Sequence, residues 1–165
     1  ISSSQRTNQS STLLPTATII KRACIILNDK IDGMARKRVG QIVIPPGVIV
    51  QKHEKLVADF LAVDQGWDII FLEADRSIGS KTPDIAMNNL KWEIKSPKGK
   101  SSRTIENNLR AALLQSPNIV LDLRRMDRRI PAGRLERDAE RRFHDAKKIK
   151  RLYVITRGEA LLRLE

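Results

Sequence analysis

The sequence predicts a mixed α/β fold, in which a central mixed sheet is flanked by helices. Apolar and charged residues alternate from Leu90 to Ile94, which is the period of a β-strand. Apolar residues recur at helical spacing in residues 51–63 and again in residues 102–116. Short apolar runs such as residues 118–123 suit covered strands. Strands that alternate with helices along a chain indicate a sheet with helices packed on its faces.

The N-terminal part of the chain is predicted in two segments. Residues 1–17 are rich in Ser and Thr and are expected to form a flexible leader. Residues 18–50 form an N-terminal extension, in which residues 42–50 suggest strand, turn and strand around Pro45-Pro46-Gly47. Residues 1–50 could serve as a delivery segment, as part of the fold, or as a contact for a host activating factor.

The main domain is expected to span residues 51–165. Its predicted elements are a helix at 51–63, a strand at 67–72, a hairpin at 82–95, a helix at 102–116, a strand at 118–123, a helix at 134–149, and strands at 152–156 and 160–164. A basic connection at 124–129 and a break at Pro131-Ala132-Gly133 precede the last helix.

The hairpin carries the most informative pattern. Asn88-Asn89 is a plausible two-residue turn, because Asn tolerates positive φ. Folding back at this turn would bring Asp84 alongside Glu93 and Lys95. Side chains two apart on a strand share a face, so Glu93 and Lys95 project together while their apolar neighbours pack into the core.

Two carboxylates and a lysine in this arrangement suit metal-assisted cleavage of phosphodiesters. Asp84 and Glu93 would offer hard oxygen ligands to Mg²⁺ or another divalent cation. Lys95 would orient the nucleophile or stabilise negative charge in the transition state. Glu93 and Lys95 could instead be the solvent face of an amphipathic hairpin. The Pro83-Asp84 pair upstream favours the catalytic interpretation.

Charge points to a polyanionic substrate. The net charge is +12, and residues 91–165 hold 20 Lys and Arg against 10 Asp and Glu. Such a field attracts nucleic acid, and it would equally suit an acidic protein that masks the site. The turn-rich loop after Lys95 contains Lys98 and Lys100, which are well placed to hold phosphate. Aromatic residues are only 4% of the chain, so base stacking is not expected to dominate recognition.

These motifs resemble a known group of enzymes. Pro83-Asp84 followed by Glu93-Ile94-Lys95 resembles the PD-(D/E)xK nuclease superfamily. A longer set, over about residues 50–160, resembles the C-terminal tRNase domain of contact-dependent growth-inhibition (CdiA-type) toxins. It comprises Lys81-Thr82-Pro83-Asp84-Ile85, Trp92-Glu93-Ile94-Lys95-Ser96-Pro97, Gly99-Lys100-Ser101, Thr104-Ile105, Asn108-Leu109, Ala112, Gln115-Ser116 and Asn118-Ile119-Val120-Leu121-Asp122-Leu123.

The resemblance implies a restriction-endonuclease-like fold and further site residues. It implies that Glu54 adds an acidic group to the site, although a carboxylate at a helix start also favours the helix dipole. It also implies that Thr104, Asn108 and Gln115 lie near the substrate, with helix capping and solvent exposure as the alternatives.

The expected function is a toxin nuclease that cleaves RNA, above all tRNA, in the cytoplasm of a target bacterium. The chain would then be a fragment of a larger secreted or cell-surface toxin, and a cognate, acidic immunity protein would neutralise it. A DNase of the same fold and a non-enzymatic nucleic-acid-binding module are the alternatives. The nucleophile also stays open between water and the RNA 2′-OH, and the latter route can proceed without a metal.

Composition bounds the remaining classes. With 165 residues, 41% of them hydrophobic and 30% charged, the chain suits one domain with a real core. No apolar run approaches the roughly 20 residues of a membrane-spanning helix. The single cysteine, Cys24, excludes an intramolecular disulfide.

Overall fold

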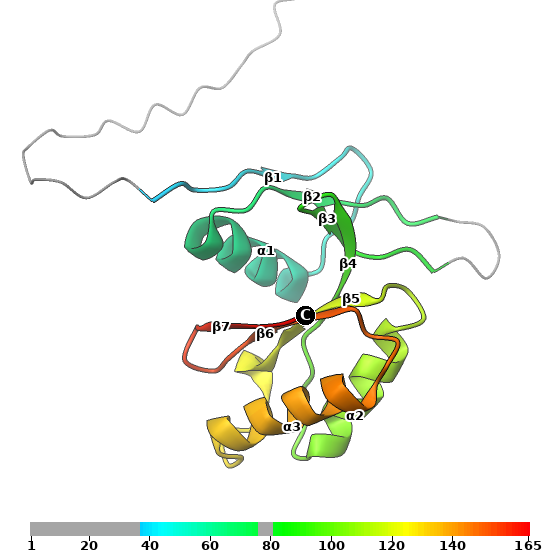
Figure 1. Ribbon diagram of the computed structural model, residues 1–165. Helices are drawn as coiled ribbons and strands as arrows, with labels where there is room; N and C mark the ends of the chain where they lie inside the picture. The colour runs from blue at the N-terminus through cyan, green and yellow to red at the C-terminus, as the bar shows by residue number, and fades with distance from the viewer. Residues whose placement is uncertain (1–36, 76–80) are drawn as a thin grey trace, which may run out of the picture. The chain divides into compact units, whose positions relative to one another are not determined.

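Seven strands and three α-helices make up most of the regular structure in residues 37–75 and 81–165, the part of the chain that the computed structural model describes (Figure 1). The strands are β1 (Ile42–Val43), β2 (Ile69–Phe71), β3 (Ile85–Met87), β4 (Leu90–Lys95), β5 (Asn118–Asp122), β6 (Arg151–Ile155) and β7 (Leu161–Leu164). The helices are α1 (Lys52–Gln65), α2 (Ser102–Ala112) and α3 (Ala132–Asp145), with a 3-10 turn, η1 (Leu123–Arg125), after β5. The predicted mixed α/β class is confirmed.

The strands lie in the sheet in the order in which they occur along the chain. β1 and β2 pair in parallel, as do β4, β5 and β6. β3 pairs antiparallel with both of its neighbours, and β7 pairs antiparallel with β6. Each parallel connection contains a helix, because parallel neighbours require a crossover while antiparallel neighbours need only a turn.

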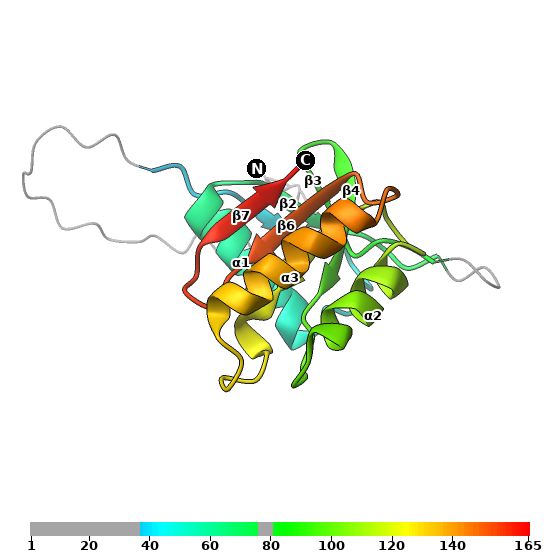
Figure 2. The ribbon, with the colours of Figure 1, turned by 60° about the horizontal axis from the view of Figure 1, so that its bottom comes forward.

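Helices cover both faces of the sheet. α1 packs on one face, where Val57 and Leu61 meet Trp92 and Tyr153. α2 and α3 lie side by side on the other face, which is turned toward the viewer in Figure 2. There Ile105 of α2 and the α3 side chains contact the opposite face of β5 and β6.

This double cover explains the burial of the central strands. All five residues of β5 are buried, and so are Trp92, Glu93 and Ile94 at successive positions of β4. The alternation in β4 predicted one solvent-facing side. The alternative that Glu93 belongs to a solvent face does not hold, because its side chain is buried on the side of the sheet where α2 packs.

The turn between β3 and β4 has the predicted form. Asn88 and Asn89 have φ values of 52° and 59°, as a two-residue turn of type I′ requires. The register Ile85↔Trp92 and Met87↔Leu90 follows directly from this turn.

Three element predictions need correction. The second strand expected before residue 50 does not form, because the chain turns at Pro45, whose carbonyl accepts from Val48 N, and then leads into α1. α3 starts at Ala132, because Pro131 provides an N-cap where the sequence indicated a break, and it ends at Asp145 rather than near residue 149. α2 ends at Ala112, shorter than predicted.

The N-terminal segments are described only in part. The predicted leader, residues 1–17, and residues 18–36 of the extension lie outside the described residues. Residues 37–50 contribute β1, and the Gly40 amide donates to Ala62 O at 2.8 Å. A Cβ at Gly40 would lie 1.9 Å from the Trp67 carbonyl oxygen, so only glycine fits this approach. Among the described residues, no helix is long and apolar enough to cross a membrane.

Candidate active site

The β3–β4 hairpin brings Asp84 beside Glu93 and Lys95. Asp84 directly precedes β3, and the type I′ register places it opposite the middle of β4. Its Oδ2 accepts a hydrogen bond from the backbone N of Ile94 at 2.7 Å. The carboxyl group is thereby fixed between the two β4 residues whose side chains complete the predicted triad.

Glu93 is the buried centre of this group. Its side chain is 1% exposed, and its Oε1 accepts from Lys95 Nζ and from Gln115 Nε2. Its Oε2 is also buried and has no hydrogen-bond partner within the described residues. An unpartnered buried carboxylate oxygen is costly, so it marks a place where a further donor or a cation would bind favourably.

Burial sets the protonation of Glu93. Desolvation raises the pKa of its carboxyl to about 7 from an ordinary 4.5. The hydrogen bond from Lys95 opposes this rise, and the neighbouring charge of Asp84 adds to it. Glu93 is therefore poised to change its charge near neutral pH, where a bound cation would favour the ionised form.

Gln115 reaches the site because the segment after α2 is anchored to β4. Ser116 Oγ donates to the carbonyl oxygen of Lys91 at 2.8 Å, and Asn118 Nδ2 donates to the same oxygen at 3.1 Å. These bonds hold the segment against the strand, so the Gln115 amide lies over Glu93. The resemblance pointed to Gln115, and the structure shows which group it contacts.

Glu54 faces a hollow that Asp84 also lines. The hollow has a volume of about 300 Å³, and Glu73 and Pro83 contribute to its wall. Glu54 Oε2 accepts from the backbone N of Gln51 at 2.9 Å, which completes a capping box at the start of α1. Both interpretations of Glu54 thus have a structural basis: it caps the helix and it borders the space next to Asp84.

The remaining predicted contacts are distributed along the loop after β4 and along α2. Lys98 and Lys100 are exposed. Thr104 packs against Gly99, where an added Cβ would lie 2.3 Å from its Oγ1. Asn108 Nδ2 donates to the carbonyl oxygen of Thr104 at 2.8 Å. Thr104 and Asn108 therefore support α2 and the loop, while the two lysines point to solvent.

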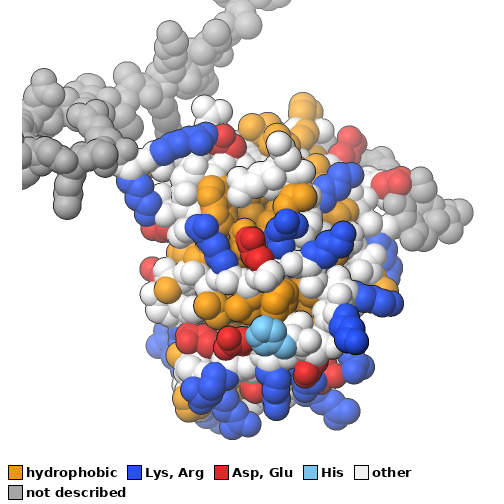
Figure 3. Space-filling model, viewed as in Figure 1, with side chains coloured by type: hydrophobic (Ala, Val, Ile, Leu, Met, Phe, Trp, Pro, Cys, Tyr) orange, Lys and Arg blue, Asp and Glu red, His pale blue; other side chains and the backbone are white. Residues whose placement is uncertain are grey.

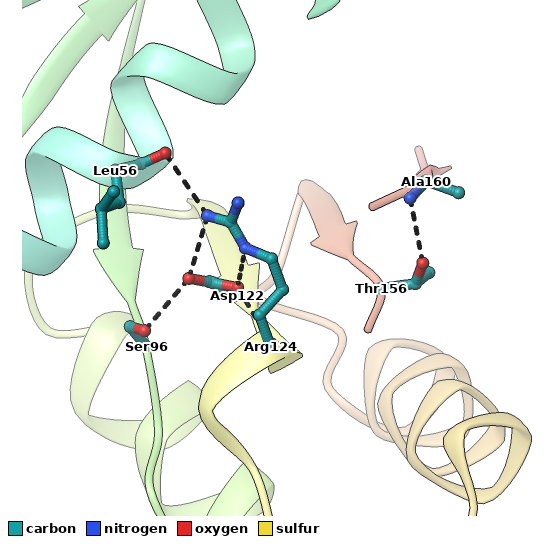
Figure 4. A network of polar contacts seen from close by, with 6 residues as sticks. All are labelled: Leu56, Ser96, Asp122, Arg124, Thr156 and Ala160. Carbon is teal, nitrogen blue, oxygen red and sulfur yellow. Dashed lines mark hydrogen bonds and ion pairs between the residues drawn. The ribbon is translucent and has the colours of Figure 1, made fainter. Parts of the chain in front are cut away.

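A buried ion pair beside the site was missed from the sequence (Figure 4). Asp122, 2% exposed, accepts from Arg124 Nε at 2.9 Å and from Ser96 Oγ at 3.2 Å. Arg124 Nη2 donates to the carbonyl oxygen of Leu56 at 3.4 Å. This Asp122–Arg124 clamp joins α1 to the ends of β4 and β5. The available signal was an aspartate that ends an apolar run with an arginine two residues later.

The oxygen set fits a hard divalent cation. Mg²⁺ is commonly held by one or two carboxylates together with water and substrate phosphate, rather than by a cage of protein ligands. Asp84 and Glu93, whose Oε2 has no hydrogen-bond partner in the described part of the chain, provide two such carboxylates. Among the described residues, no group of three or more His, Cys, Asp or Glu side chains is arranged to hold a metal. Such an ion would therefore depend on water or phosphate for its other ligands.

Solved structures include a chain with the same fold. In the CdiA-CT/CdiI toxin and immunity complex from Burkholderia pseudomallei, one chain superposes with a TM-score of 0.57. The match covers 76% of this chain and 99% of that chain, at 18% sequence identity. This likeness establishes a shared α/β fold.

The family comparison concerns the part of the chain that carries the site. Residues 81–161 match the family described as the contact-dependent growth inhibition CdiA C-terminal domain. The matched segment contains the hairpin with Asp84, Glu93 and Lys95, and also Gln115. No curated protein matches the sequence. The predicted resemblance to CdiA-type C-terminal domains is confirmed at this level, while the nuclease superfamily stays a prediction.

Proposed function

We propose that this chain is the nuclease domain of a contact-dependent growth-inhibition toxin that cleaves RNA, with tRNA as the principal substrate. The observation that carries the proposal is the buried Glu93, which lies beside Asp84, accepts hydrogen bonds from Lys95 and Gln115, and has one oxygen without a partner among the described residues. A carboxylate that a fold keeps buried beside a second carboxylate costs stability, and groups perturbed in this way are concentrated at functional sites.

A divalent cation completes the proposed chemistry. Asp84 and Glu93 would hold it, and when bound it would supply charge neutralisation at the phosphate and a lowered pKa of a coordinated water. Lys95 holds Glu93 Oε1 and is 22% exposed, so its ammonium group can reach both the carboxylate and an incoming phosphate. Gln115 donates to the same oxygen of Glu93 and limits the rotation of the carboxylate.

The surface suits a polyanion. Residues 91–165 carry a net charge of +10, which supplies long-range attraction for nucleic acid. In Figure 3 lysine and arginine side chains gather along the lower edge, over the region of α2 and α3. The exposed Lys98 and Lys100 extend this charge along the loop that begins next to Lys95.

The proposed biological setting follows from the family match. The chain would be the C-terminal part of a larger cell-surface toxin and would act in the cytoplasm of the target bacterium. A cognate immunity protein would protect the producer, by analogy with the complex whose fold it shares. We expect that protein to be acidic, because it must compete with nucleic acid for a strongly basic surface.

A substrate panel tests the proposal. Purified protein is incubated with total bacterial tRNA, with messenger RNA and with duplex DNA, each with Mg²⁺ and with EDTA. We expect discrete tRNA fragments from the wild type in Mg²⁺ and none from Asp84→Ala. Cleavage of DNA alone would contradict the RNase proposal and support the alternative, a DNase of the same fold. Intact polymers in every lane, with tRNA still bound, would contradict catalysis and leave a binding module.

A further inference from the structure

A second hollow, lined by basic side chains, lies where the end of the loop after β4 meets the segment that leads into α3. It has a volume of about 330 Å³, and three cations, Lys100, Arg129 and Arg134, line it. We propose that this hollow binds a backbone phosphate of the RNA a few nucleotides away from the scissile bond. The inference rests on the proposed function in taking RNA as the polyanion.

The three cations are only weakly committed elsewhere. Arg129 Nε lies 3.9 Å from Asp127 Oδ1, with the arginine side chain 85% exposed. Arg134 Nε lies 4.0 Å from Asp138 Oδ2, with the arginine 65% exposed. Exposed pairs at such distances contribute little, so both guanidinium groups are available to an anion. Lys100 is exposed and forms no ion pair within the described residues.

One carboxylate, that of Asp127, borders the hollow and reduces its positive charge. Asp127 lines the wall, but its Oδ1 already accepts from the backbone N of Arg129 at 2.9 Å. Its charge therefore fixes the loop and is partly offset by Arg129. Three cations against one carboxylate leave the hollow positive.

The starts of two helices reinforce this charge. Ser101 and Pro131, the N-cap residues of α2 and α3, both line the hollow. Neither helix has a side-chain cap or an acidic residue in its first turn, whereas α1 has Glu54 in a capping box. The positive ends of both helix dipoles thus have no carboxylate in the first turn to offset them, which favours an anion there.

The walls of the hollow are fixed before any ligand binds. The backbone N of Asp127 donates to Gly99 O at 3.1 Å, which joins the two loops. Arg157 donates from Nη1 to Ile130 O and from Nη2 to Asp127 O, each at 2.9 Å. A preorganised wall lowers the entropic cost of binding.

The position of the hollow suits one RNA chain that also reaches the active site. Lys100 follows Lys95 by five positions, so their Cα atoms are at most about 18 Å apart. A strand leaving the active site along the loop would therefore meet the hollow after a few nucleotides. Contacts of this kind position a substrate without reading its sequence.

The test measures binding of intact tRNA as a function of salt, in an Asp84→Asn background that leaves the RNA uncut. Lys100→Gln combined with Arg134→Gln should lower the slope of log Kd against log salt by about one to two units. The matched control, Lys147→Gln combined with Lys148→Gln, removes the same charge beyond the other end of α3, about 20 Å away. The control should lower the slope by less.

A second variant separates binding from folding. Ser101→Asp places a carboxylate at the N-cap of α2, which should preserve or raise the melting temperature while weakening tRNA binding. Asn107→Asp adds the same charge to an exposed position of α2 and serves as its control. Stability and affinity then move in opposite directions, which structural damage would not produce.

The outcomes distinguish this inference from the proposed function. Slopes and affinities equal to those of the control variants would contradict phosphate binding in the hollow, even if the wild type cleaves tRNA. If the same substitutions weakened binding of the immunity protein but not of tRNA, the hollow would be a site for a carboxylate of that protein, and the inference that it binds RNA would be wrong. If the substitutions weaken tRNA binding but the wild type never cleaves RNA, phosphate binding in the hollow would be supported and the proposed catalysis would be contradicted.

Discussion

At the scale of single residues, Glu93 connects the fold to the proposed chemistry. It is buried on the face covered by α2, and it receives hydrogen bonds from Lys95 and Gln115. Its second oxygen has no partner in the described part of the chain. The same burial that makes this carboxylate costly to the fold makes it a strong ligand for a cation.

Stability should fall with rising pH because of Glu93. Its pKa of about 7 in the folded state exceeds the ordinary 4.5, so the folded protein holds a proton that the unfolded chain has lost. The contribution is complete below pH 4.5 and is lost as pH rises through 7, by up to about 3 kcal/mol. Urea unfolding in EDTA at pH 5 and pH 7.5 should show this loss in the wild type.

The matched variant is Glu93→Gln, which keeps the shape of the side chain but cannot ionise. Its stability should change less over the same pH interval. Equal pH dependence in the two proteins would contradict the shifted pKa of Glu93.

Magnesium should stabilise the folded protein through Asp84 and Glu93. At a tenfold excess over Kd, a ligand of the folded state adds about 1.4 kcal/mol, which corresponds to roughly 3–5 °C in melting temperature. Thermal melts at pH 8 should show this rise in the wild type and in Glu73→Gln, an exposed carboxylate in the hollow next to Asp84. The rise should disappear in Asp84→Asn and Glu93→Gln. A rise that survives in both would place the ion elsewhere.

At the scale of elements, the site depends on the hairpin and on the clamp at the strand ends. The β3–β4 turn sets the register that places Asp84 beside Ile94 N. The Asp122–Arg124 clamp joins Ser96, next to Lys95, to the carbonyl of Leu56 in α1. Two elements from distant parts of the sequence are thereby held against the strand that carries the site.

Removing the guanidinium of the clamp should destabilise the protein. Arg124→Met keeps an apolar side chain near Phe60 but leaves Asp122 buried without its ionic partner. We expect a loss of about 2–3 kcal/mol, measured by urea unfolding. Arg125→Met, at the neighbouring half-buried arginine, should cost less than about 0.5 kcal/mol. Equal effects of the two substitutions would contradict the clamp.

Local sequence signals predicted the hairpin well. Asn88-Asn89 and the alternation in β4 specify a turn and a pairing register, both of which depend on adjacent residues. The burial of Glu93 could not be predicted in this way, because it depends on α2, which follows β4 in the chain. The pairing of Asp122 with Arg124 is local in the sequence, but it was missed for another reason: a charged residue after an apolar run ordinarily marks the start of a loop.

At the scale of the whole chain, the distribution of charge could be predicted from the sequence, whereas the order of the strands in the sheet could not. The concentration of basic residues after position 90 is visible in the sequence and predicts a polyanionic partner. The sequence order of the strands and the division of the helices between the two faces come from long-range packing, which a local period does not encode. The hollow lined by Lys100 and Arg134 likewise requires two helix starts to meet.

The most direct measurement is the single-turnover rate of tRNA cleavage by Lys95→Ala beside Lys91→Ala. Both substitutions remove a lysine from β4, but only Lys95 contacts Glu93, while the side chain of Lys91 is exposed. With Mg²⁺ present, we expect Lys95→Ala to be slower than the wild type by at least about a hundredfold. Lys91→Ala should stay within about threefold, since it lies outside the group. Equal rates for the two variants would contradict a catalytic site built from Asp84, Glu93 and Lys95.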